Sequence, residues 1–480
     1  MTDIILFQPL VGKEWSVINS PRLPLGLLHA AKIVAGEYQI RLIDMAVENN
    51  WKEILKNEID KKPICFALSC KTGSQIKYAL EASSFVKQSS EIPIVWGGMH
   101  PTLLPEKTLV NKNIDILVQG DGEITFYELV KALVQKKSLK DILGISYKKN
   151  GGIIFNPPRP SVDLDGLPRI PYGLIDIKKY TMTMEGKGSI DICSSRGCQN
   201  KCGFCYNSAN NSRWIGMRPE KFIEELESTL GLSNKIKHVR IIDDDFFCNI
   251  KRAKEIIRKI YKYNITWECF GLVSRSAARI DDDFLELISK SGCTGLTMGV
   301  ESGSERILKI INKKNDLDFI IGFNKRLSKY NLRGVYSFVC GFYSETLRDL
   351  KKTIELAQLL IKDNKKSTIS FQIYTPYPGT TLYDSAVKEG FVPPESLKDW
   401  IGHEMKGVDL PWIDENRRKV LKGVYFCSHF IDNKLNIHIK KKWIQLLASL
   451  YRPIARFRMT NLFFRVNLEL VVAESYLKLI

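Results

Sequence analysis

The sequence predicts an α/β protein with a doubly wound N-terminal sheet, a full or partial β/α barrel and a mostly helical, basic C-terminal region. Short apolar runs alternate with helix-like stretches up to about residue 150 and again, with longer helices, over residues 186–400. The segment between them, residues 151–185, is rich in Pro and Gly. A chain of 480 residues with 44% hydrophobic residues is long enough for two or three buried cores.

The first region, residues 1–150, has the pattern of a Rossmann-like domain. Its apolar runs are the length of strands, and helix-like segments such as LGLLHAAKIVAG separate them. Strands that alternate with helices in this way form a parallel sheet. We therefore expect five parallel strands, in the runs IILFQP, YQIRLID, ICFALS, IPIVWGG and IDILVQG.

Residues 151–185 are predicted to be a linker, and the alternation then resumes over residues 186–400. Five strand-like runs, mostly followed by helices, are HVRIID, ITWECFG, GLTMGV, VYSFVCGF and TISFQIY. This pattern favours a β/α barrel of the TIM type, in which the chemistry takes place at the carboxyl ends of the strands. The last region, residues 401–480, is expected to be a helical basic domain.

Composition restricts where the protein works and what it contacts. The start, MTDIILFQPL, has no basic region before its apolar run, and no stretch approaches the ~18 apolar residues of a membrane span. We expect a cytoplasmic protein whose eleven cysteines are thiols or metal ligands. The net charge is +18, and residues 417–480 contain thirteen Lys/Arg against three acids. Such a segment can face nucleic acid, an anionic membrane, an acidic substrate or only solvent.

Four cysteines lie within thirteen residues, at positions 193, 198, 202 and 205. Structural zinc usually takes two separated Cys-x-x-Cys pairs, and only Cys202 and Cys205 form one. A plant-type ferredoxin loop has gaps of four and then two residues, which this loop does not reproduce. Cys198-x-x-x-Cys202-x-x-Cys205 instead provides three thiolates for three irons of a [4Fe–4S] cluster, which leaves the fourth iron open.

The motif RGCQNKCGFCYN resembles the radical S-adenosylmethionine (SAM) enzymes. Later segments match in order: IIDDDFFCN, SRSAARID, GCTGLTMGVESGSERILKIINK and TPYPGTTLYDSAVKEG. The resemblance implies that Cys198, Cys202 and Cys205 hold the cluster and that SAM chelates the open iron. It also implies SAM contacts from Phe204, Arg275, Glu301 and an aspartate of residues 243–245, of which Asp244 is the one we select. GFYSETLRDL departs from the family, which often has Pro-Gly before Glu-Thr.

The N-terminal region resembles the cobalamin-binding domain that precedes the barrel in one large class of these enzymes. RLPLGLLHAAKI, WGGMHPTLLPE and VQGDGEITFYELVKAL carry the resemblance. The histidine motif Asp-x-His-x-x-Gly is absent, and residues 8–24 contain no histidine. The resemblance implies cobalamin bound base-off, without a histidine lower ligand. The predicted cobalamin-binding residues are Pro24, Leu25, Gly26, Ser69, Thr72, Gly97, Gly98, His100, Gly120, Asp121 and Glu123.

By this resemblance the protein is a radical SAM methyltransferase. SAM cleavage would give a 5′-deoxyadenosyl radical that activates a substrate carbon, which then receives a methyl group from methylcobalamin. Two other functions stay open. One is a cyclase, oxidoreductase or other rearrangement on a porphyrin, lipid or natural product, as in the anaerobic magnesium-protoporphyrin cyclase group. The other is a cluster- and cobalamin-binding protein without turnover.

The expected partners are a small-molecule or lipid-like substrate and an external electron donor such as flavodoxin or ferredoxin. An RNA-binding domain is not recognisable, so nucleic acid is not an expected partner. In the tail, LASLYRPIARFRMTNLFFRVNLELVV interleaves arginines with apolar residues. A helix there would bury one face in the protein and leave Arg452, Arg456 and Arg458 outside, either against an anionic membrane or in a domain that caps the barrel and pairs with acids on it. Cys193 is expected to be a small buried residue or a substrate contact.

Overall fold

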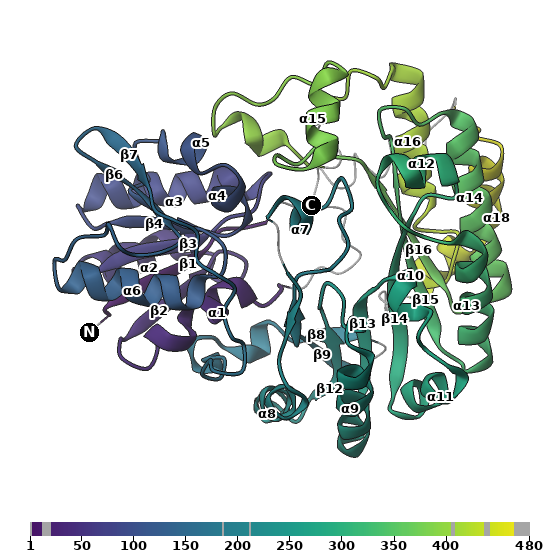
Figure 1. Ribbon diagram of the computed structural model, residues 1–480, viewed down its shortest axis with the longest axis horizontal. Helices are drawn as coiled ribbons and strands as arrows, with labels where there is room; N and C mark the ends of the chain where they lie inside the picture. Colours follow the sequence, from purple (N-terminus) through teal and green to yellow (C-terminus); the bar gives the residue numbers. More distant parts are fainter. Residues whose placement is uncertain are drawn as a thin grey trace.

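The computed structural model describes residues 2–11, 21–184, 187–210, 213–404, 409–435 and 442–464. Two seven-stranded sheets dominate these residues. Figure 1 shows the sheets side by side, with helix α7 (Tyr206–Ala209), which follows the last of the four clustered cysteines, between them. The predicted α/β fold class is confirmed. Within the described ranges, none of the helices combines the length and the hydropathy that a transmembrane span requires.

The N-terminal sheet has the strand order β2-β1-β3-β4-β5-β6-β7. The first five strands are parallel, and β6 and β7 are antiparallel additions at one edge. All five predicted strands are therefore present. The strands are β1 (Ile4–Gln8), β2 (Ile40–Asp44), β3 (Cys65–Ser69), β4 (Ile94–Gly97), β5 (Ile116–Val118), β6 (Ile145–Lys149) and β7 (Gly152–Phe155).

Helices cover both faces of this sheet, as a doubly wound fold requires. Along β1, Ile4 and Leu6 belong to one buried cluster and Ile5 and Phe7 to another, because successive side chains of a strand point to opposite faces. The first cluster includes residues of α1 and α6, and the second includes residues of α2 and α3. The helices are α1 (Leu25–Val34), α2 (Trp51–Ile59), α3 (Gln75–Ser89), α4 (Met99–Leu103), α5 (Pro105–Leu109) and α6 (Gly122–Val134).

The start of the predicted linker is a strand. Asn150 and Gly151 have φ values of 51° and 77°, which suit the two central residues of a tight hairpin turn. The turn sends residues 152–155 back along β6, so the first residues after position 150 belong to the N-terminal sheet. The Pro-rich stretch that follows has the short 3₁₀ turns η1 (Tyr172–Leu174) and η2 (Ile177–Lys179), and residues 182–184 near its end already form a strand of the second sheet. The predicted boundary at residue 185 stays a prediction.

The second sheet is an open half-barrel with the order β16-β15-β14-β13-β12-β9-β8. Six of its strands are parallel, and β8 is antiparallel at one edge. Of the two predicted forms, the partial barrel is the one observed. The strands are β8 (Met182–Met184), β9 (Lys187–Ile192), β12 (Ile236–Ile241), β13 (Thr266–Leu272), β14 (Cys293–Glu301), β15 (Arg333–Cys340) and β16 (Thr368–Ile373).

The helices of the half-barrel follow its strands along the chain. The buried side chains of these helices and of the strands form one large apolar cluster. The helices are α8 (Pro219–Leu230), α9 (Ile250–Ile260), α10 (Ser274–Ala277), α11 (Asp282–Lys290), α12 (Glu305–Ile310), α13 (Leu317–Lys329), α14 (Leu347–Asp363) and α15 (Thr381–Lys388), with the 3₁₀ turns η3 (Tyr261–Tyr263) and η4 (Asp399–Gly402).

A row of charged residues crosses the half-barrel at one level. Strand register places Asp191, Arg240, Glu268, Gly295 and Arg333 next to one another on five neighbouring strands. Arg240 binds both Asp191 and Glu268 at 3.0 Å, and Arg333 reaches Glu268 at 2.9 Å. A Cβ atom at Gly295 would lie 3.1 Å from Arg333 Nε, so the glycine leaves the space that this arginine crosses.

Buried contacts join the two sheets. Lys32 of α1 and Glu225 of α8 form an ion pair of 2.8 Å with almost no exposed side-chain surface. Trp400 of η4, which follows the barrel in the chain, is buried in the core of the N-terminal domain. Glu404 accepts a hydrogen bond of 2.5 Å from the Ser74 backbone. The N-terminal domain therefore includes a segment from beyond the barrel, which the chain order alone does not predict.

The described part of the C-terminal region is helical, as predicted, but it has no core of its own. Helix α16 (Glu415–Cys427) and helix α18 (Lys442–Thr460) bury side chains in the cluster of the barrel. Asp432, between them, accepts a hydrogen bond of 2.7 Å from the Ile369 amide of β16. These helices therefore extend the barrel core at the β16 side. The predicted tail beyond Phe464 lies outside the described residues.

Candidate active site

The cysteine loop begins at the carboxyl end of β9, where barrel chemistry is expected. Before Cys198 the chain forms β10 (Ser195–Arg196), which pairs with β11 (Ile215–Gly216). Gly197 has a φ of +77°, and a side chain there would run into the Arg213 carbonyl. Helix α7 starts directly after Cys205. The three predicted cluster ligands thus occupy a short loop with regular structure at both ends.

Backbone hydrogen bonds fix this loop to two later segments of the barrel. The Gly203 amide donates to the Ile311 carbonyl, and the Leu382 amide donates to the Gly203 carbonyl, both at 2.9 Å. The side chain of Asn312 donates to the Lys201 carbonyl at 2.6 Å. The ends of α12 and α15 therefore position the cysteines.

The thiols of Cys198, Cys202 and Cys205 lie near one another; Cys202 is buried, and Cys198 and Cys205 are half-buried. Burial raises the pKa of Cys202 to about 11, Lys313 opposes the shift, and the other two thiols add to it. No three His, Cys, Asp or Glu side chains of the described residues surround a common point where a single metal ion would bind. A cubane cluster does not require this, because each thiolate ligates a different iron. The arrangement therefore matches a cluster better than a zinc ion.

Cys193 lies outside this group. Its thiol donates to the Ser195 carbonyl at 2.9 Å, and burial raises its pKa, with Asp243 the next cause. Cys193 is half-buried, so the two expectations for it, a packed residue of the barrel and a substrate contact, both stay predictions.

Glu301 ends β14 and faces the cysteine loop. Its φ of +69° is a left-handed conformation that non-glycine residues seldom adopt, and such backbone strain is concentrated at functional sites. Lys313 Nζ lies 3.4 Å from Glu301 Oε1, and both side chains are at most 10% exposed. Burial lowers the pKa of Lys313, but Glu301 and Cys202 raise it by more. A buried ammonium group therefore lies between the predicted SAM contact and the cluster thiols, and sequence reasoning missed it.

The three adjacent aspartates after β12 have different surroundings. Asp243 is buried and accepts hydrogen bonds from Ser194 and Ser195, including one of 2.6 Å from Ser195 Oγ. Asp244 is exposed and accepts from the Gly197 amide at 2.8 Å. These two residues therefore orient the chain just before Cys198. The SAM contact predicted for Asp244 stays a prediction, and its observed partner is the loop backbone.

Asp245 faces a small cavity of about 130 Å³ beside the cysteine loop. Burial raises the pKa of Asp245 to about 7, which the Ser276 hydroxyl opposes, and its Oδ1 has no hydrogen-bond partner in the described structure. The predicted residue Arg275, on α10, lines the same cavity together with Asn200. Arg275 lines this cavity, and Glu301 does not.

Phe204 lines a second cavity, of about 330 Å³, between the two domains. The ends of β15 and β16 contribute Val339 and residues 372–375, and the N-terminal domain contributes Lys71, Thr72 and Met99. The Phe204 ring packs 6.1 Å from Phe342. Phe204 and the predicted cobalamin residue Thr72 therefore face the same space, although they come from different domains.

A third cavity, of about 260 Å³, lies at the carboxyl ends of β1, β3, β4 and β5, the usual ligand position in such sheets. Gly98 has a φ of +95°, and a Cβ atom there would lie 2.8 Å from Ser69 Oγ. The absence of a side chain keeps this part of the cavity open. The predicted cobalamin residues that line it are Gly26, Ser69, Gly97, Gly98, Gly120, Asp121 and Glu123.

Arg196 joins this cavity to the cysteine loop. Its guanidinium binds Asp121 at 2.9 Å, binds Glu123, and donates to His29 Nδ1 at 3.0 Å. Burial, Arg196 and Lys32 lower the pKa of His29 to about 3, so the imidazole is neutral and accepts this bond. Sequence reasoning singled out neither Arg196 nor His29. The one feature of the sequence that could have pointed to Arg196 is its position, two residues before Cys198.

Three other predicted cobalamin residues are not among those that line these cavities. His100 is completely buried, its Nδ1 lies 3.0 Å from Thr72 Oγ1, and burial lowers its pKa to about 4, with His403 the second cause. Pro24 is the N-cap of α1, and Leu25 is the first residue of that helix. Their predicted contacts with cobalamin stay predictions.

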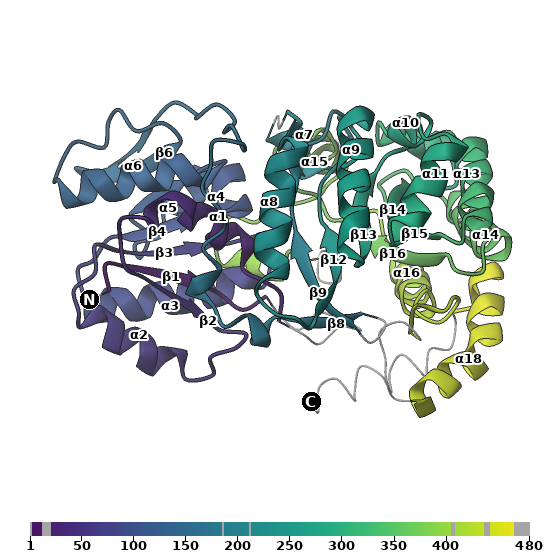
Figure 2. The same ribbon diagram turned by 90° about the horizontal axis from the view of Figure 1, so that it is seen from below.

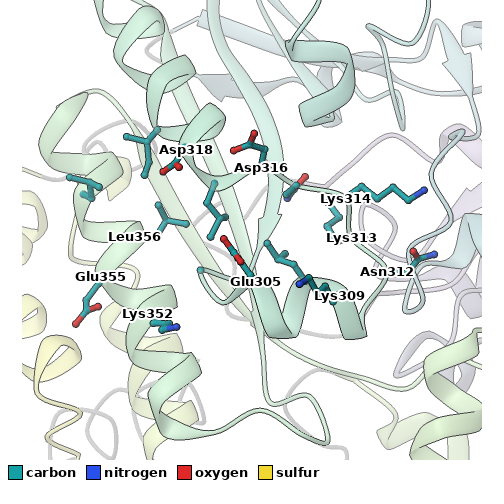
Figure 3. A pocket seen from close by; sticks show the side chains of 16 residues that line it. Glu305, Lys309, Asn312, Lys313, Lys314, Asp316, Asp318, Lys352, Glu355 and Leu356 are labelled. Carbon is teal, nitrogen blue, oxygen red and sulfur yellow. The ribbon is translucent and has the colours of Figure 1, made fainter.

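A wider groove of about 920 Å³ lies among α12, α13, α14 and the loop at residues 311–316 (Figure 3). It has more volume than the cavities near the cysteines, but no predicted site residue lines it. Its charges are balanced, with four lysines (Lys309, Lys313, Lys314 and Lys352) and four acids (Glu305, Asp316, Asp318 and Glu355). We therefore place the site at the cysteine loop and not in this groove.

Comparisons with known proteins agree with this geometry. Residues 192–357 match the radical SAM superfamily, and residues 17–130 match the B12 binding domain. An uncharacterized methyltransferase of Pyrococcus horikoshii is 33% identical over 393 residues, which cover 81% of this chain and 83% of that protein. The chain belongs to the radical SAM methyltransferase class with a cobalamin-binding domain.

Two further known proteins are similar to this radical SAM enzyme. The anaerobic magnesium-protoporphyrin IX monomethyl ester cyclase of Synechocystis is 29% identical over 295 residues, which are 61% of this chain and 58% of the cyclase. The structure of the cobalamin-dependent SAM radical enzyme OxsB with aqua-cobalamin bound has a TM-score of 0.77 at 18% identity. It covers 100% of this chain and 75% of OxsB, so the two proteins share their fold over both domains.

The two domains of the enzyme indicate a [4Fe–4S] cluster, SAM and cobalamin as its cofactors. The observed residues are compatible with these groups. Three thiols on one fixed loop provide the donor set of a cluster with an open iron, and Lys313 provides a cation beside it. The glycine-walled cavity at the strand ends admits part of a large ligand close to the backbone.

Proposed function

We propose that this enzyme methylates an unactivated carbon of a small-molecule or lipid-like substrate. One observation carries the proposal: Arg196 lines the cavity of the cobalamin-binding domain, and Cys198 follows two residues later. A single short segment thus links the walls of the two cofactor sites. Such proximity is what a reaction needs when one cofactor creates a substrate radical and another supplies the group it receives.

When bound, the cluster and SAM supply a 5′-deoxyadenosyl radical, and cobalamin supplies the methyl group. The residues of the chain hold and shield these groups. Cys198, Cys202 and Cys205 would bind three irons and leave one open, and Glu301 would accept hydrogen bonds from SAM. Lys313 favours the ionised form of Glu301, because it opposes the burial that raises the pKa of that carboxyl. Phe204 and the ends of β15 and β16 enclose the space between the domains and exclude water.

We further propose that cobalamin binds base-off, without a histidine below the cobalt. The Nδ1 atom of His29 accepts from Arg196, and that of His100 lies next to Thr72. His29 lines the cavity and its Nε2 has no hydrogen-bond partner in the described structure, so it is the histidine to test. The cob(II)alamin electron paramagnetic resonance spectrum should show no nitrogen splitting. A splitting that disappears in His29→Ala would contradict the proposal.

Anaerobic reconstitution with iron, sulfide and cobalamin, followed by assay of 5′-deoxyadenosine with a low-potential donor such as flavodoxin or ferredoxin, tests the radical chemistry. Methyl-labelled SAM with candidate substrates then tests the transfer. A loaded protein that never forms 5′-deoxyadenosine would refute the proposed function and leave cofactor binding without turnover as the function.

A cyclase, oxidoreductase or other rearrangement activity is the second candidate, and the match to the magnesium-protoporphyrin cyclase favours it. That match covers 58% of the cyclase, so its substrate is not carried over to this chain. The same labelling experiment separates the two functions. A product that forms together with 5′-deoxyadenosine but contains no methyl label would support the second candidate.

A further inference from the structure

The cavity of about 260 Å³ in the N-terminal domain has apolar walls and a charged end. Val118 of β5 and Phe126 of α6 are two of the wall residues. Four side chains that are joined by ion pairs and hydrogen bonds form the charged end: His29, Asp121, Glu123 and Arg196. Figure 2 shows α1, the helix that carries His29, beside α8 of the half-barrel, to which an ion pair joins it. The charged end therefore lies where the two domains meet.

Arg196 determines which nitrogen of His29 carries the proton. A guanidinium group has N–H donors and no acceptor, so Arg196 donates to His29 Nδ1, at 3.0 Å. Burial and then the charge of Arg196 lower the pKa of His29 to about 3, so the ring is neutral. A neutral imidazole that accepts at Nδ1 has its proton on Nε2. His29 therefore offers an N–H donor at the cavity, and this Nε2 atom has no hydrogen-bond partner in the described structure.

Glu123 adds an acceptor next to this donor. One of its oxygens, Oε1, binds Arg196, and the other, Oε2, has no hydrogen-bond partner among the described residues. Burial raises the pKa of this carboxyl, but Arg196 lowers it by more, so Glu123 is ionised and only accepts. Both side chains are more than nine-tenths buried. Buried donors and acceptors normally have partners, so this pair indicates a ligand with one acceptor and one donor.

We propose that His29 and Glu123 select the lower base of the bound cobalamin. The His29 N–H donates to a ring nitrogen of that base, and Glu123 accepts from a hydroxyl of the ribose that carries it. This role rests on the base-off binding proposed above, because only a base that has left the cobalt turns its nitrogen to the protein. The cavity holds a flat base between its apolar walls but is too small for the whole cofactor.

The charge of this end agrees with a neutral base. Asp121 and Glu123 carry two negative charges against the one positive charge of Arg196, so the phosphate of the cofactor is repelled from it. The proton on Nε2 also keeps His29 from binding cobalt, because a metal needs the lone pair of an imidazole nitrogen and Arg196 occupies that of Nδ1. A cofactor whose lower base has no ring nitrogen should therefore bind less tightly.

Equilibrium dialysis of the intact chain with three probes tests the proposal. The probes are cobalamin, a cobamide with p-cresol as its lower base, which has no ring nitrogen, and cobinamide, which has no nucleotide. The wild type should bind cobalamin roughly tenfold more tightly than the p-cresol cobamide. His29→Phe keeps a flat ring without the N–H donor, so this preference should fall roughly fivefold while the affinity for cobinamide stays the same.

Two further variants separate recognition from packing. His29→Gln is the matched control, because its carbonyl can accept from Arg196 while its amide donates to the base, and it should retain most of the preference. Glu123→Gln should weaken cobalamin and the p-cresol cobamide equally relative to cobinamide, because both carry the ribose. Equal wild-type affinity for cobalamin and the p-cresol cobamide would overturn the proposal, as would a His29→Phe protein that keeps the full preference.

A free nucleoside has the same chemistry as the nucleotide tail. Adenosine that displaces cobalamin, with an affinity that falls in His29→Phe, would assign the charged end to a nucleoside and overturn the proposal. None of these measurements uses SAM or a reductant, so they are independent of the proposed methylation. Cobalamin that is base-off by electron paramagnetic resonance but bound without a base preference would refute this inference alone. A loaded protein that forms no 5′-deoxyadenosine would refute the proposed function and leave this inference standing.

Discussion

The four clustered cysteines differ in what their thiols face, and this difference predicts their response to substitution. The Cys198 and Cys205 thiols lie close enough to Cys202 to raise its pKa, whereas the Cys193 thiol bonds to the Ser195 carbonyl. Each of the variants Cys198→Ala, Cys202→Ala and Cys205→Ala should lose the iron–sulfur absorbance, because two thiolates do not hold the cluster. Cys193→Ala should keep it. Iron and sulfide analysis of the reconstituted proteins measures both outcomes, and a Cys193→Ala protein without iron would contradict this assignment.

The structure, but not the sequence, predicts that Lys313 is needed for SAM binding and cleavage. Lys313→Met leaves Glu301 buried without its cation, and an unpaired buried carboxylate becomes protonated. We expect at least tenfold slower SAM cleavage and weaker SAM binding, with the cluster retained. The matched control is Lys314→Met, since Lys314 is exposed and lies next in the chain. Equal loss in both variants would show that the effect is not specific to the buried ion pair.

At the residue level, motifs predicted those site residues that lie close together in the chain. The site residues that are far apart in the chain come together only through the fold. The cluster cysteines lie within eight residues and were recognisable from their spacing. Lys313 is twelve residues from Glu301, and Arg196 is 167 residues from His29, and only tertiary structure brings these pairs together. The three aspartates after β12 looked equivalent in sequence, but one is exposed and two are buried. Their different roles follow from burial, which a lone sequence does not report.

At the level of the strands, the row of charged residues across the half-barrel predicts how much a buried ion pair contributes to stability. Arg240 binds two carboxylates, and its side chain is only 5% exposed. Arg240→Met would leave Asp191 and Glu268 without their shared cation, at a cost of about 3–5 kcal/mol of unfolding free energy. Urea unfolding of the two proteins measures it. The double variant Arg240→Met, Asp191→Asn should recover part of the loss, and no recovery would contradict the pairing.

Glu345, in the turn after β15, should make the stability of the folded protein depend on pH. Burial raises the pKa of Glu345 from 4.5 to about 7, although the Gly341 amide and Arg417 oppose the shift. Below pH 4.5 the group is protonated in both states. Between pH 4.5 and 7 it ionises more readily in the unfolded chain, so the folded state loses stability as the pH rises. The wild type should lose about 3 kcal/mol relative to Glu345→Gln between pH 4.5 and 7.5.

Urea unfolding of both proteins across that pH range measures the difference. A constant difference would mean that Glu345 stays ionised against Arg417, whose Nη2 lies 3.4 Å away. A growing advantage of the wild type at high pH would mean that the ion pair dominates burial.

Periodicity predicted the elements better than their orientation. Apolar runs located the five N-terminal parallel strands, because each is buried on both faces. The same signal did not find β7, whose residues are exposed or half-buried and depend on the Asn150–Gly151 turn. In α18 the pattern indicated an amphipathic helix, but Arg458, which was expected outside, is buried, and large apolar side chains of the helix are exposed. Small residues on the inner face decided this orientation, since they allow α18 to approach the barrel closely.

At the scale of the whole molecule, the two domains depend on each other. The N-terminal core takes Trp400 and Leu397 from beyond the barrel, and the Lys32–Glu225 and Arg196–Glu123 pairs cross the same boundary. Domain order was readable from two successive β/α alternations. The return of residues 391–404 to the N-terminal domain could not be predicted from the sequence. These residues contain no regular element longer than a 3₁₀ turn, and the residues they contact lie hundreds of positions away in the chain.

Trp400 is therefore the residue whose loss should separate the domains. Its ring is 1% exposed and packs 5.8 Å from that of His100. Trp400→Ala should remove about 3–5 kcal/mol from the stability of the N-terminal domain, because the cavity is deep inside its core. Scanning calorimetry should show the N-terminal transition moving below that of the barrel, with weaker cobalamin retention and an intact cluster. Trp443→Ala is the matched control, since that side chain is 61% exposed, and its effect should stay within about 0.5 kcal/mol. If Trp400→Ala lowered both transitions equally, the two domains would form one cooperative unit and η4 would not be the element that joins them.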